Sequence, residues 1–256
     1  MPLLRALLAE ARALLVEAWR RRIRGSVWDW AMAVPTIFFA LAAVAQFDFP
    51  VARLTPIDNG AWTPGLGPAA EAFSFWGDYL TGTFIVSFGL IGAGIVAKRE
   101  TWRRAGLAAL LAASLAGIPG STLRLTLGRP RPSATAAEAA AQLHRASPSQ
   151  VVPVVSFGRT LRPSAPPDGF YGPHPTALLQ GFPSGHATTS MATASALLVA
   201  LPEVGVPAMV GAVGVCWSRA WLGRHYLSDL VTGAALGLAF GLPLGAAARR
   251  RNSLPQ

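Results

Sequence analysis

Long apolar runs, separated by short polar or glycine-containing segments, dominate the sequence from residue 29 onward. A helix needs about 20 predominantly apolar residues to cross a bilayer. Six runs have about this length, at residues 29–47, 79–97, 105–123, 186–202, 204–222 and 228–247. The pattern therefore predicts an all-α, polytopic membrane protein with six transmembrane helices.

The first 24 residues follow a different pattern. Leucine and alanine recur at helical spacing from Leu3 to Trp19, and most of the charged residues lie around the other side of the helix. We expect residues 1–27 to form an amphipathic helix on the membrane surface. A cleaved signal peptide is the alternative, but its candidate apolar core is interrupted by Arg5, Glu10, Arg12 and Glu17.

The distribution of basic residues indicates how the chain crosses the membrane. Arginines are concentrated in residues 5–24, in the turn 98–104 and in the tail 249–251, which all lie on one side if six spans are present. Because cytoplasmic segments carry an excess of Lys and Arg, both termini are predicted to be cytoplasmic. The predicted organisation is a surface helix at 1–27, a membrane domain at 28–248 and a basic cytoplasmic tail at 249–256.

Composition agrees with a membrane protein and argues against other classes. Of the 256 residues, 52% are hydrophobic and 13% are charged, which is far too apolar for an ordinary soluble protein. A net charge of +10 would suggest nucleic acid in a soluble domain, but 21 of the 22 basic residues are arginines, concentrated beside apolar runs. We attribute this charge to topology and phosphate binding, and expect no nucleic-acid partner. The single cysteine, Cys216, excludes an intrachain disulfide.

Three short polar stretches stand at the ends of the predicted spans. They are Arg124-x6-Arg131-Pro132, Pro183-Ser184-Gly185-His186, and Ser218-Arg219-x5-His225-x3-Asp229. With six spans, all three lie at the same outer face of the membrane. Ionisable groups at membrane depth are costly unless they are used, so this convergence indicates a functional site. His225 and Asp229 are four residues apart and share one face of a helix, where a carboxylate can hold an imidazole in one tautomer.

In order and internal spacing, the three stretches resemble the signature of the type 2 phosphatidic acid phosphatase (PAP2) family, which shares its fold with the vanadium haloperoxidases. The first motif of the family usually opens with Lys, whereas this chain has Arg124, a planar fork in place of a flexible point donor. The resemblance implies that His225 attacks phosphorus and becomes a phosphohistidine, with Asp229 orienting its other ring nitrogen. His186 then protonates the leaving oxygen and activates water in the second step.

The same resemblance implies a phosphate-binding set around the two histidines. Arg124, Arg131 and Arg219 would clamp the phosphoryl oxygens, because the fork of a guanidinium suits that geometry. Ser184 and Gly185 stand just ahead of the fourth predicted span, where free backbone N–H groups and the helix dipole favour an anion.

The residues around the motifs are less informative. Arg129 and Arg224 lie between motif positions and are interpreted as surface or headgroup contacts. No carboxylate cluster is expected beside the site, and we therefore expect no metal and no cofactor. Residues 133–182 form the one long connection, and loops of this length are usually functional or disordered. The two interpretations are a cap over the substrate entrance and a poorly ordered surface segment.

These expectations define an integral membrane lipid phosphatase in a bacterial inner membrane, with its active site at the periplasmic face. The expected substrate is a membrane lipid phosphate of the undecaprenyl diphosphate, phosphatidylglycerol phosphate or lipid A 1-phosphate class, whose tail stays in the bilayer. The alternatives are a lipid-phosphate binder or translocator without turnover, and a haloperoxidase-like enzyme. The pairing of His225 with Asp229 favours the phosphatase, because a binder needs only the arginines. The sequence indicates no obligate protein partner.

Overall fold

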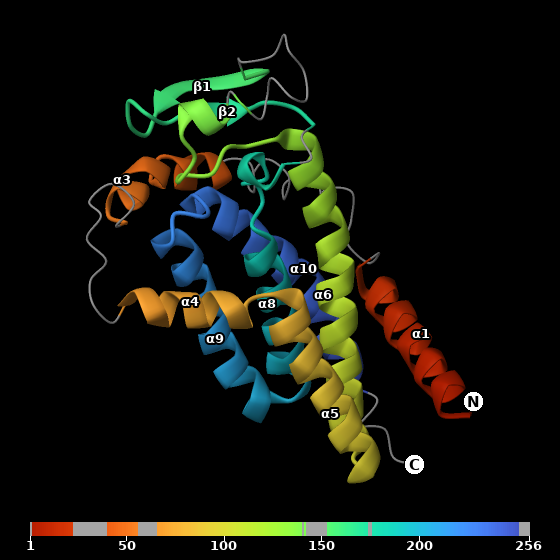
Figure 1. Cartoon of the computed structure of the whole chain (residues 1–256). Helices are drawn as coiled ribbons and strands as arrows, with labels where there is room; N and C mark the ends of the chain where they lie inside the picture. Colours follow the sequence, from red (N-terminus) through yellow and green to blue (C-terminus); the bar gives the residue numbers. More distant parts are fainter. Residues whose placement is uncertain are drawn as a thin grey trace.

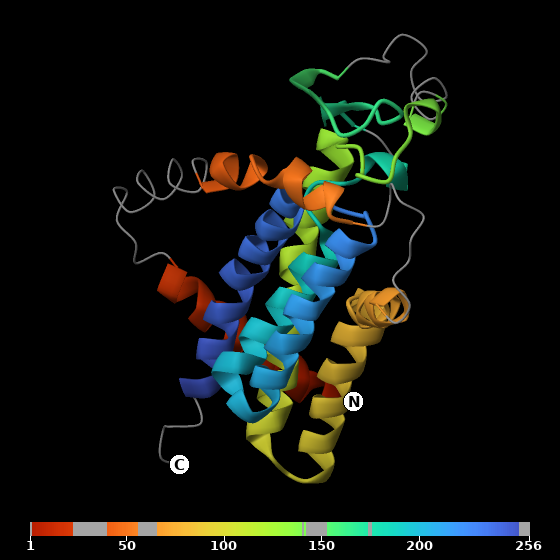
Figure 2. The ribbon, with the colours of Figure 1, turned by 90° about the vertical axis from the view of Figure 1, so that its left-hand side faces the viewer.

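The apolar runs fold into a bundle of helices that lie side by side (Figures 1 and 2). The computed structural model describes residues 2–22, 40–55, 66–139, 141, 153–173 and 176–250. Within these residues, the bundle consists of α5 (Ile85–Val96), α6 (Glu100–Leu127), α8 (Gly185–Ala200), α9 (Pro202–Trp221) and α10 (Leu227–Arg250). Helix α8 is central, because it packs against α6, α9 and α10.

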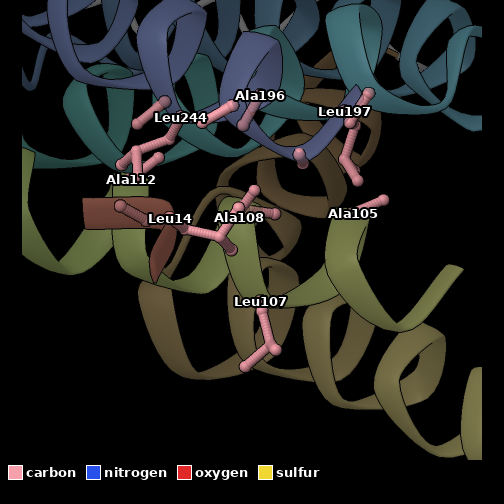
Figure 3. Close-up of a cluster of buried hydrophobic side chains, with 14 of the residues drawn as sticks. Leu14, Ala105, Leu107, Ala108, Ala112, Ala196, Leu197 and Leu244 are labelled. Atoms are coloured by element: carbon pink, nitrogen blue, oxygen red, sulfur yellow. The ribbon is translucent and has the colours of Figure 1, made fainter. Parts of the chain in front are cut away.

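Small side chains let these helices approach closely. Along α10, glycines recur every fourth residue at 233, 237, 241 and 245, and this stripe faces α8. A Cβ atom on Gly237 would lie 2.6 Å from the carbonyl oxygen of Thr188, so any larger residue there would push the two helices apart. Buried alanines of α6 and α8 form the adjacent cluster shown in Figure 3, where Ala112 lies near Leu244 and Ala108 lies near Leu14. Small residues at helix interfaces are typical of membrane proteins, where close packing replaces the hydrophobic effect.

Among the described residues, three helical segments are long and apolar enough to cross a membrane. They are Tyr79–Val96, in which the π-helix η1 (Tyr79–Phe84) continues into α5, then Glu100–Leu127 and Leu227–Arg249. The spans expected at 186–202 and 204–222 coincide with α8 and α9, which are helical but do not meet both conditions. Most of the span expected at 29–47 lies outside the described residues. The count of six spans therefore stays a prediction.

The N-terminal segment is helical, as α1 (Pro2–Arg22), and packs against α10 and α6. Leu14 is buried in this contact, and Glu10 pairs with Arg103 at 2.9 Å. Other apolar side chains of α1, such as Leu4 and Trp19, are exposed and could face lipid. The helix itself is present, whereas its position on the membrane surface stays a prediction.

At one end of the bundle, residues that precede α8 fold over the helix ends (Figure 1). The strands β1 (Val155–Thr160) and β2 (Pro167–Phe170) form an antiparallel hairpin in which Val155 lies opposite Phe170. The hairpin is followed by the 3-10 helix η2 (Ala177–Leu179). We call the described residues 153–173 the cap. The short helix α3 (Asp48–Arg53) lies at the same end.

The chain is mostly helical, as expected, and the described residues add one element that the apolar pattern did not predict. Four prolines between residues 153 and 167 prevent a helix there and leave an irregular hairpin. In the described part of 133–182, Tyr171 and Leu179 form a small buried cluster of their own. At the level of α9, helix α4 (Leu66–Trp76) packs against the bundle and leads into η1.

Candidate active site

The structure brings the three polar stretches together at the cap end of the bundle. Backbone hydrogen bonds join them: the Ser184 N–H donates to the carbonyl oxygen of Asp229 at 3.0 Å, and the Gly181 N–H donates to that of Arg129 at 2.8 Å. The Ser133 N–H donates to the carbonyl oxygen of Gly223 at 3.0 Å. The site is therefore built on helix ends that are bonded to one another through the main chain.

Local sequence explains why the helices end here. Helix α6 ends at Leu127 because Gly128 follows with φ of 65°, a left-handed conformation that favours glycine. The nearby backbone at Gly172 also requires glycine at position 128, since a Cβ atom at Gly128 would lie 2.1 Å from the carbonyl oxygen of Gly172. Gly223 has φ of 61° in the turn after α9, and this turn places His225 between α9 and α10.

His225 is buried, with 4% of its surface exposed, and Asp229 beside it is fully buried. Its Nδ1 lies 2.7 Å from the carbonyl oxygen of Gly181 and 3.7 Å from Oδ2 of Asp229. A carbonyl oxygen can only accept, so Nδ1 carries the proton and Nε2 keeps its lone pair. The resemblance implied that Asp229 orients Nδ1; in the structure the hydrogen-bond acceptor is Gly181, and Asp229 is a neighbour. No side-chain motif could have revealed Gly181, because it acts through its backbone.

The surroundings of His225 keep its imidazole neutral. Burial, together with the positive charges of Arg131 and Arg219, lowers the pKa of His225 well below its usual value of 6.5. A neutral imidazole with a free Nε2 lone pair is the form that can act as a nucleophile.

The three predicted phosphate-binding arginines come from different segments: Arg124 from α6, Arg131 from the loop after it, and Arg219 from α9. Arg124 donates to the Ser121 hydroxyl at 2.9 Å, and Arg219 donates to the Ser74 hydroxyl at 2.6 Å. In each arginine the Nε atom is buried without an acceptor. Among the described residues, no carboxylate forms an ion pair with any of the three. The group of three is therefore a partly buried cationic surface with Nε donors that an anion could use.

The start of α8 contributes the second histidine and a helix N-terminus. Ser184 caps the helix, and its side chain accepts a hydrogen bond from the Ala187 N–H. A Cβ atom on Gly185 would lie 2.5 Å from Nη1 of Arg124, so glycine permits the guanidinium to approach the helix end. His186 is half-buried and lies in the first turn. Together with Arg124 it lines a cavity of about 680 Å³ between η1, α6 and α8.

From the sequence, Arg129 and Arg224 were both interpreted as surface or headgroup contacts, but the structure places them differently. Arg224 is exposed, in agreement with that interpretation. Arg129 is only 3% exposed, which corrects it. The Arg129 guanidinium forms ion pairs with Asp48 at 2.9 Å, Asp168 at 3.1 Å and Asp229 at 2.7 Å. The expectation that no carboxylate cluster accompanies the site is therefore wrong: three carboxylates are present, and they surround a guanidinium.

Comparison with known proteins identifies the class of protein that this helical fold and these motifs define. Residues 105–252 match the family model of the PAP2 superfamily, and the chain belongs to this superfamily. The resemblance in the three motifs is thereby confirmed. With its membrane-spanning helices, the chain is an integral membrane protein.

Among curated proteins, the chain is similar to a lipid A 1-phosphatase of Rhizobium etli, with 36% identity over 66 residues. This match covers 26% of the chain and only 28% of the relative. A longer match, 29% identical over 185 residues, covers 70% of the chain and 78% of a decaprenylphosphoryl-5-phosphoribose phosphatase of Mycobacterium tuberculosis. Among solved structures, a PAP2-type phosphatidylglycerolphosphate phosphatase of Bacillus subtilis aligns with a TM-score of 0.51 and 21% identity, covering 83% of this chain and 92% of that one. This likeness shows the fold.

Proposed function

We propose that the protein is a membrane lipid phosphatase that acts through a phosphohistidine on His225. The observation that carries the proposal is the group of three arginines whose buried Nε atoms have no acceptor, beside a neutral, buried imidazole. A phosphoryl group has three equatorial oxygens that such cations can bind in the transition state, while an in-line nucleophile approaches phosphorus.

The reaction proceeds in two displacements. The Nε2 lone pair of His225 attacks phosphorus, the bond between phosphorus and the leaving oxygen breaks, and His186 gives that oxygen a proton. His186 then removes a proton from water, which attacks the phosphohistidine and releases inorganic phosphate. Gly181 holds the Nδ1–H of His225 throughout, so that Nε2 points to the substrate.

The substrate is proposed to be a lipid phosphate whose tail remains in the bilayer. The cavity beside His186 is lined mainly by small and apolar residues of the spanning segments, including Gly117 and Ile118. A headgroup phosphate can therefore reach Arg124 while its tail extends between η1 and α6. Of the expected substrates, undecaprenyl diphosphate, phosphatidylglycerol phosphate and lipid A 1-phosphate all fit this description. The long match to a decaprenylphosphoryl-5-phosphoribose phosphatase adds a polyprenyl-linked sugar phosphate to these candidates.

The proposal is tested by phosphate release from purified protein in detergent micelles. The four lipid phosphates are compared with a water-soluble phosphate ester, and His225→Ala is assayed in parallel. We expect turnover of at least one lipid, in the presence of a chelator, and none by His225→Ala. A lipid-phosphate binder would retain affinity in both proteins without turnover. Equal catalytic efficiency on the soluble ester would contradict the lipid assignment, because the tail would contribute nothing to transition-state binding.

The proposed location is the inner membrane, with both termini cytoplasmic and the site at the periplasmic face. In support, α1 begins and α10 ends at the end of the bundle away from the cap (Figures 1 and 2). Ser164, exposed in the cap, is a suitable reporter once Cys216 has been replaced. An impermeant thiol reagent should label Ser164→Cys in intact spheroplasts. Labelling only after lysis would reverse the topology.

A further inference from the structure

Arg129 is bonded through every edge of its guanidinium. Nη1 donates to Oδ1 of Asp229 and to the Ser228 hydroxyl, both at 2.7 Å. Nε donates to Oδ1 of Asp168 at 3.1 Å, and Nη2 donates to Oδ2 of Asp48 at 2.9 Å. The guanidinium carbon lies 4.4 Å from the centre of the Tyr226 ring, which covers one face. Arg129 therefore has no free donor edge with which to bind a phosphate.

We propose that Arg129 is a positioning residue for the His225 imidazole, and that it acts on both groups that flank Nδ1. The inference deepens the proposed function and rests on it for the kinetic role of His225. The assignment is distinct from the three motif arginines, since Arg129 acts through other residues and does not face the substrate.

The first connection runs through the side chain. Asp229 uses one carboxylate oxygen to accept from Arg129 and the other to accept from the Tyr226 N–H at 2.8 Å. Both oxygens are thus held, and Oδ2 stays 3.7 Å from Nδ1 of His225. Without the Arg129 guanidinium, the Asp229 carboxylate would be free to turn away from Nδ1, and the Nδ1-protonated form of the ring would lose the stabilisation of that nearby negative charge.

The second connection runs through the backbone. The Arg129 carbonyl oxygen accepts from the Gly181 N–H at 2.8 Å, and the Gly181 carbonyl oxygen in turn accepts from Nδ1 of His225 at 2.7 Å. One residue therefore positions the hydrogen-bond acceptor of the imidazole with its main chain and the neighbouring carboxylate with its side chain.

The other hydrogen bonds of the Arg129 guanidinium connect the cap and α3 to Asp229. Asp168 belongs to β2 of the cap, and Asp48 begins α3, where it also accepts from the Ser228 N–H at 2.7 Å. All three carboxylates are buried, and a buried charge is unfavourable unless it is paired. Arg129 supplies the cation that all three carboxylates share, so the same guanidinium contacts the cap, α3 and Asp229.

The test compares Arg129→Lys with Arg159→Lys. Lysine at 129 keeps the charge but offers a single point donor in place of the fork. Arg159 is the matched control, because it pairs with Asp168 at 3.4 Å and lies over the Phe49 ring without contacting Asp229. For the best lipid substrate, we expect Arg129→Lys to lower kcat by about 10- to 100-fold, as for other residues that orient a catalytic group, while KM stays nearly unchanged. Arg159→Lys should retain nearly the full kcat.

A second measurement does not require turnover. In protein labelled with ¹⁵N-histidine, the ring nitrogen shifts of His225, assigned with His225→Ala, report which nitrogen carries the proton. We expect an Nδ1-protonated ring in the parent protein and in Arg159→Lys, and a mixture of tautomers in Arg129→Lys.

The outcomes separate the two proposals. Absence of turnover in the parent protein would overturn the phosphatase, and the tautomer measurement would still decide the role of Arg129. An unchanged tautomer in folded Arg129→Lys, or a raised KM with unchanged kcat, would overturn the positioning role. If Arg129→Lys does not fold, Asp229→Asn serves in its place: it removes the carboxylate charge that Arg129 holds 3.7 Å from Nδ1, so the tautomer should shift as expected for Arg129→Lys, and an unchanged tautomer would overturn the positioning role.

Discussion

Arg129 and Arg131 are two residues apart, yet their guanidinium groups have opposite surroundings. Arg129 is buried among three carboxylates, which raise the pKa of its guanidinium against the lowering effect of burial. Arg131 has a buried Nε without an acceptor, and burial together with the charges of Arg224 and Arg124 lowers the pKa of its guanidinium. The comparison separates an arginine whose charge is balanced by carboxylates from one that forms no ion pair with a carboxylate among the described residues.

The difference has an energetic meaning. A buried cation without a partner is unfavourable for folding, and the nearby positive charges of Arg124 and Arg219 add repulsion. Such a group is retained where function needs it, which is a common reason why active sites are less stable than they could be. A bound phosphoryl group would supply the missing charge. Stability should therefore respond in opposite directions to substitution at the two positions, whereas activity should fall at both.

The largest effect is expected on stability, at Arg129. Arg129→Ala leaves three buried carboxylates without their cation, and the free energy of unfolding should fall by about 3–5 kcal/mol. Chemical unfolding in micelles measures the change, with the exposed Arg224→Ala as control. Stability equal to that of the control would mean that the carboxylates find other partners.

Next in size is the loss of activity at Arg131. Arg131→Ala removes one donor to the transition-state oxygens, and kcat/KM should fall by about 10²–10³-fold, or about 2.7–4 kcal/mol. Its unfolding free energy should stay the same or rise, because an unpaired cation has been removed. A loss of stability comparable with that of Arg129→Ala would erase the distinction between the two arginines.

A smaller effect is expected on thermal stability when an anion that mimics phosphate binds. Vanadate at about 100 times its Kd should stabilise the parent protein by about 2.7 kcal/mol, seen as a rise in Tm. The rise should disappear in Arg219→Ala, which lacks one of the three unpaired cations, and persist in Arg224→Ala. An equal rise in both variants would place the anion elsewhere.

The smallest effect is a shift of the pH profile. Because the pKa of His225 is lowered, the imidazole stays neutral even at pH values below the usual pKa of 6.5, and kcat/KM should decline only as the pH falls through the lower pKa of the folded protein. The unfolded chain takes up this proton first, so the same group removes stability as the pH falls below about 6.5. In Arg131→Ala one of the lowering charges is gone, and the acidic decline should move to higher pH. A decline at the same pH in both proteins would show that His225 does not control it.

The positions of the helices and the grouping of the motif residues could be predicted from the sequence, because both depend on local pattern. The helices α5, α6, α8, α9 and α10 lie where the apolar runs placed them, since the periodicity and length of an apolar run reflect its immediate environment. The motif residues could be assigned to one site because each stands at a helix end and all the ends fall on one side. His225 and Arg219 are close for a still simpler reason, as one turn after α9 contains both.

The sequence by itself therefore determined the helices, the family and the residues that meet at the site, all of which depend on short spacings. Only the tertiary structure decided which arginine is enclosed by carboxylates, because the partners of Arg129 lie 39, 81 and 100 residues away. The acceptor of the His225 proton was likewise decided by the fold, since Gly181 contributes a carbonyl oxygen that every residue possesses. A charge in a sequence indicates what a side chain can do, but its surroundings, set by distant segments, decide whether that charge is satisfied or available.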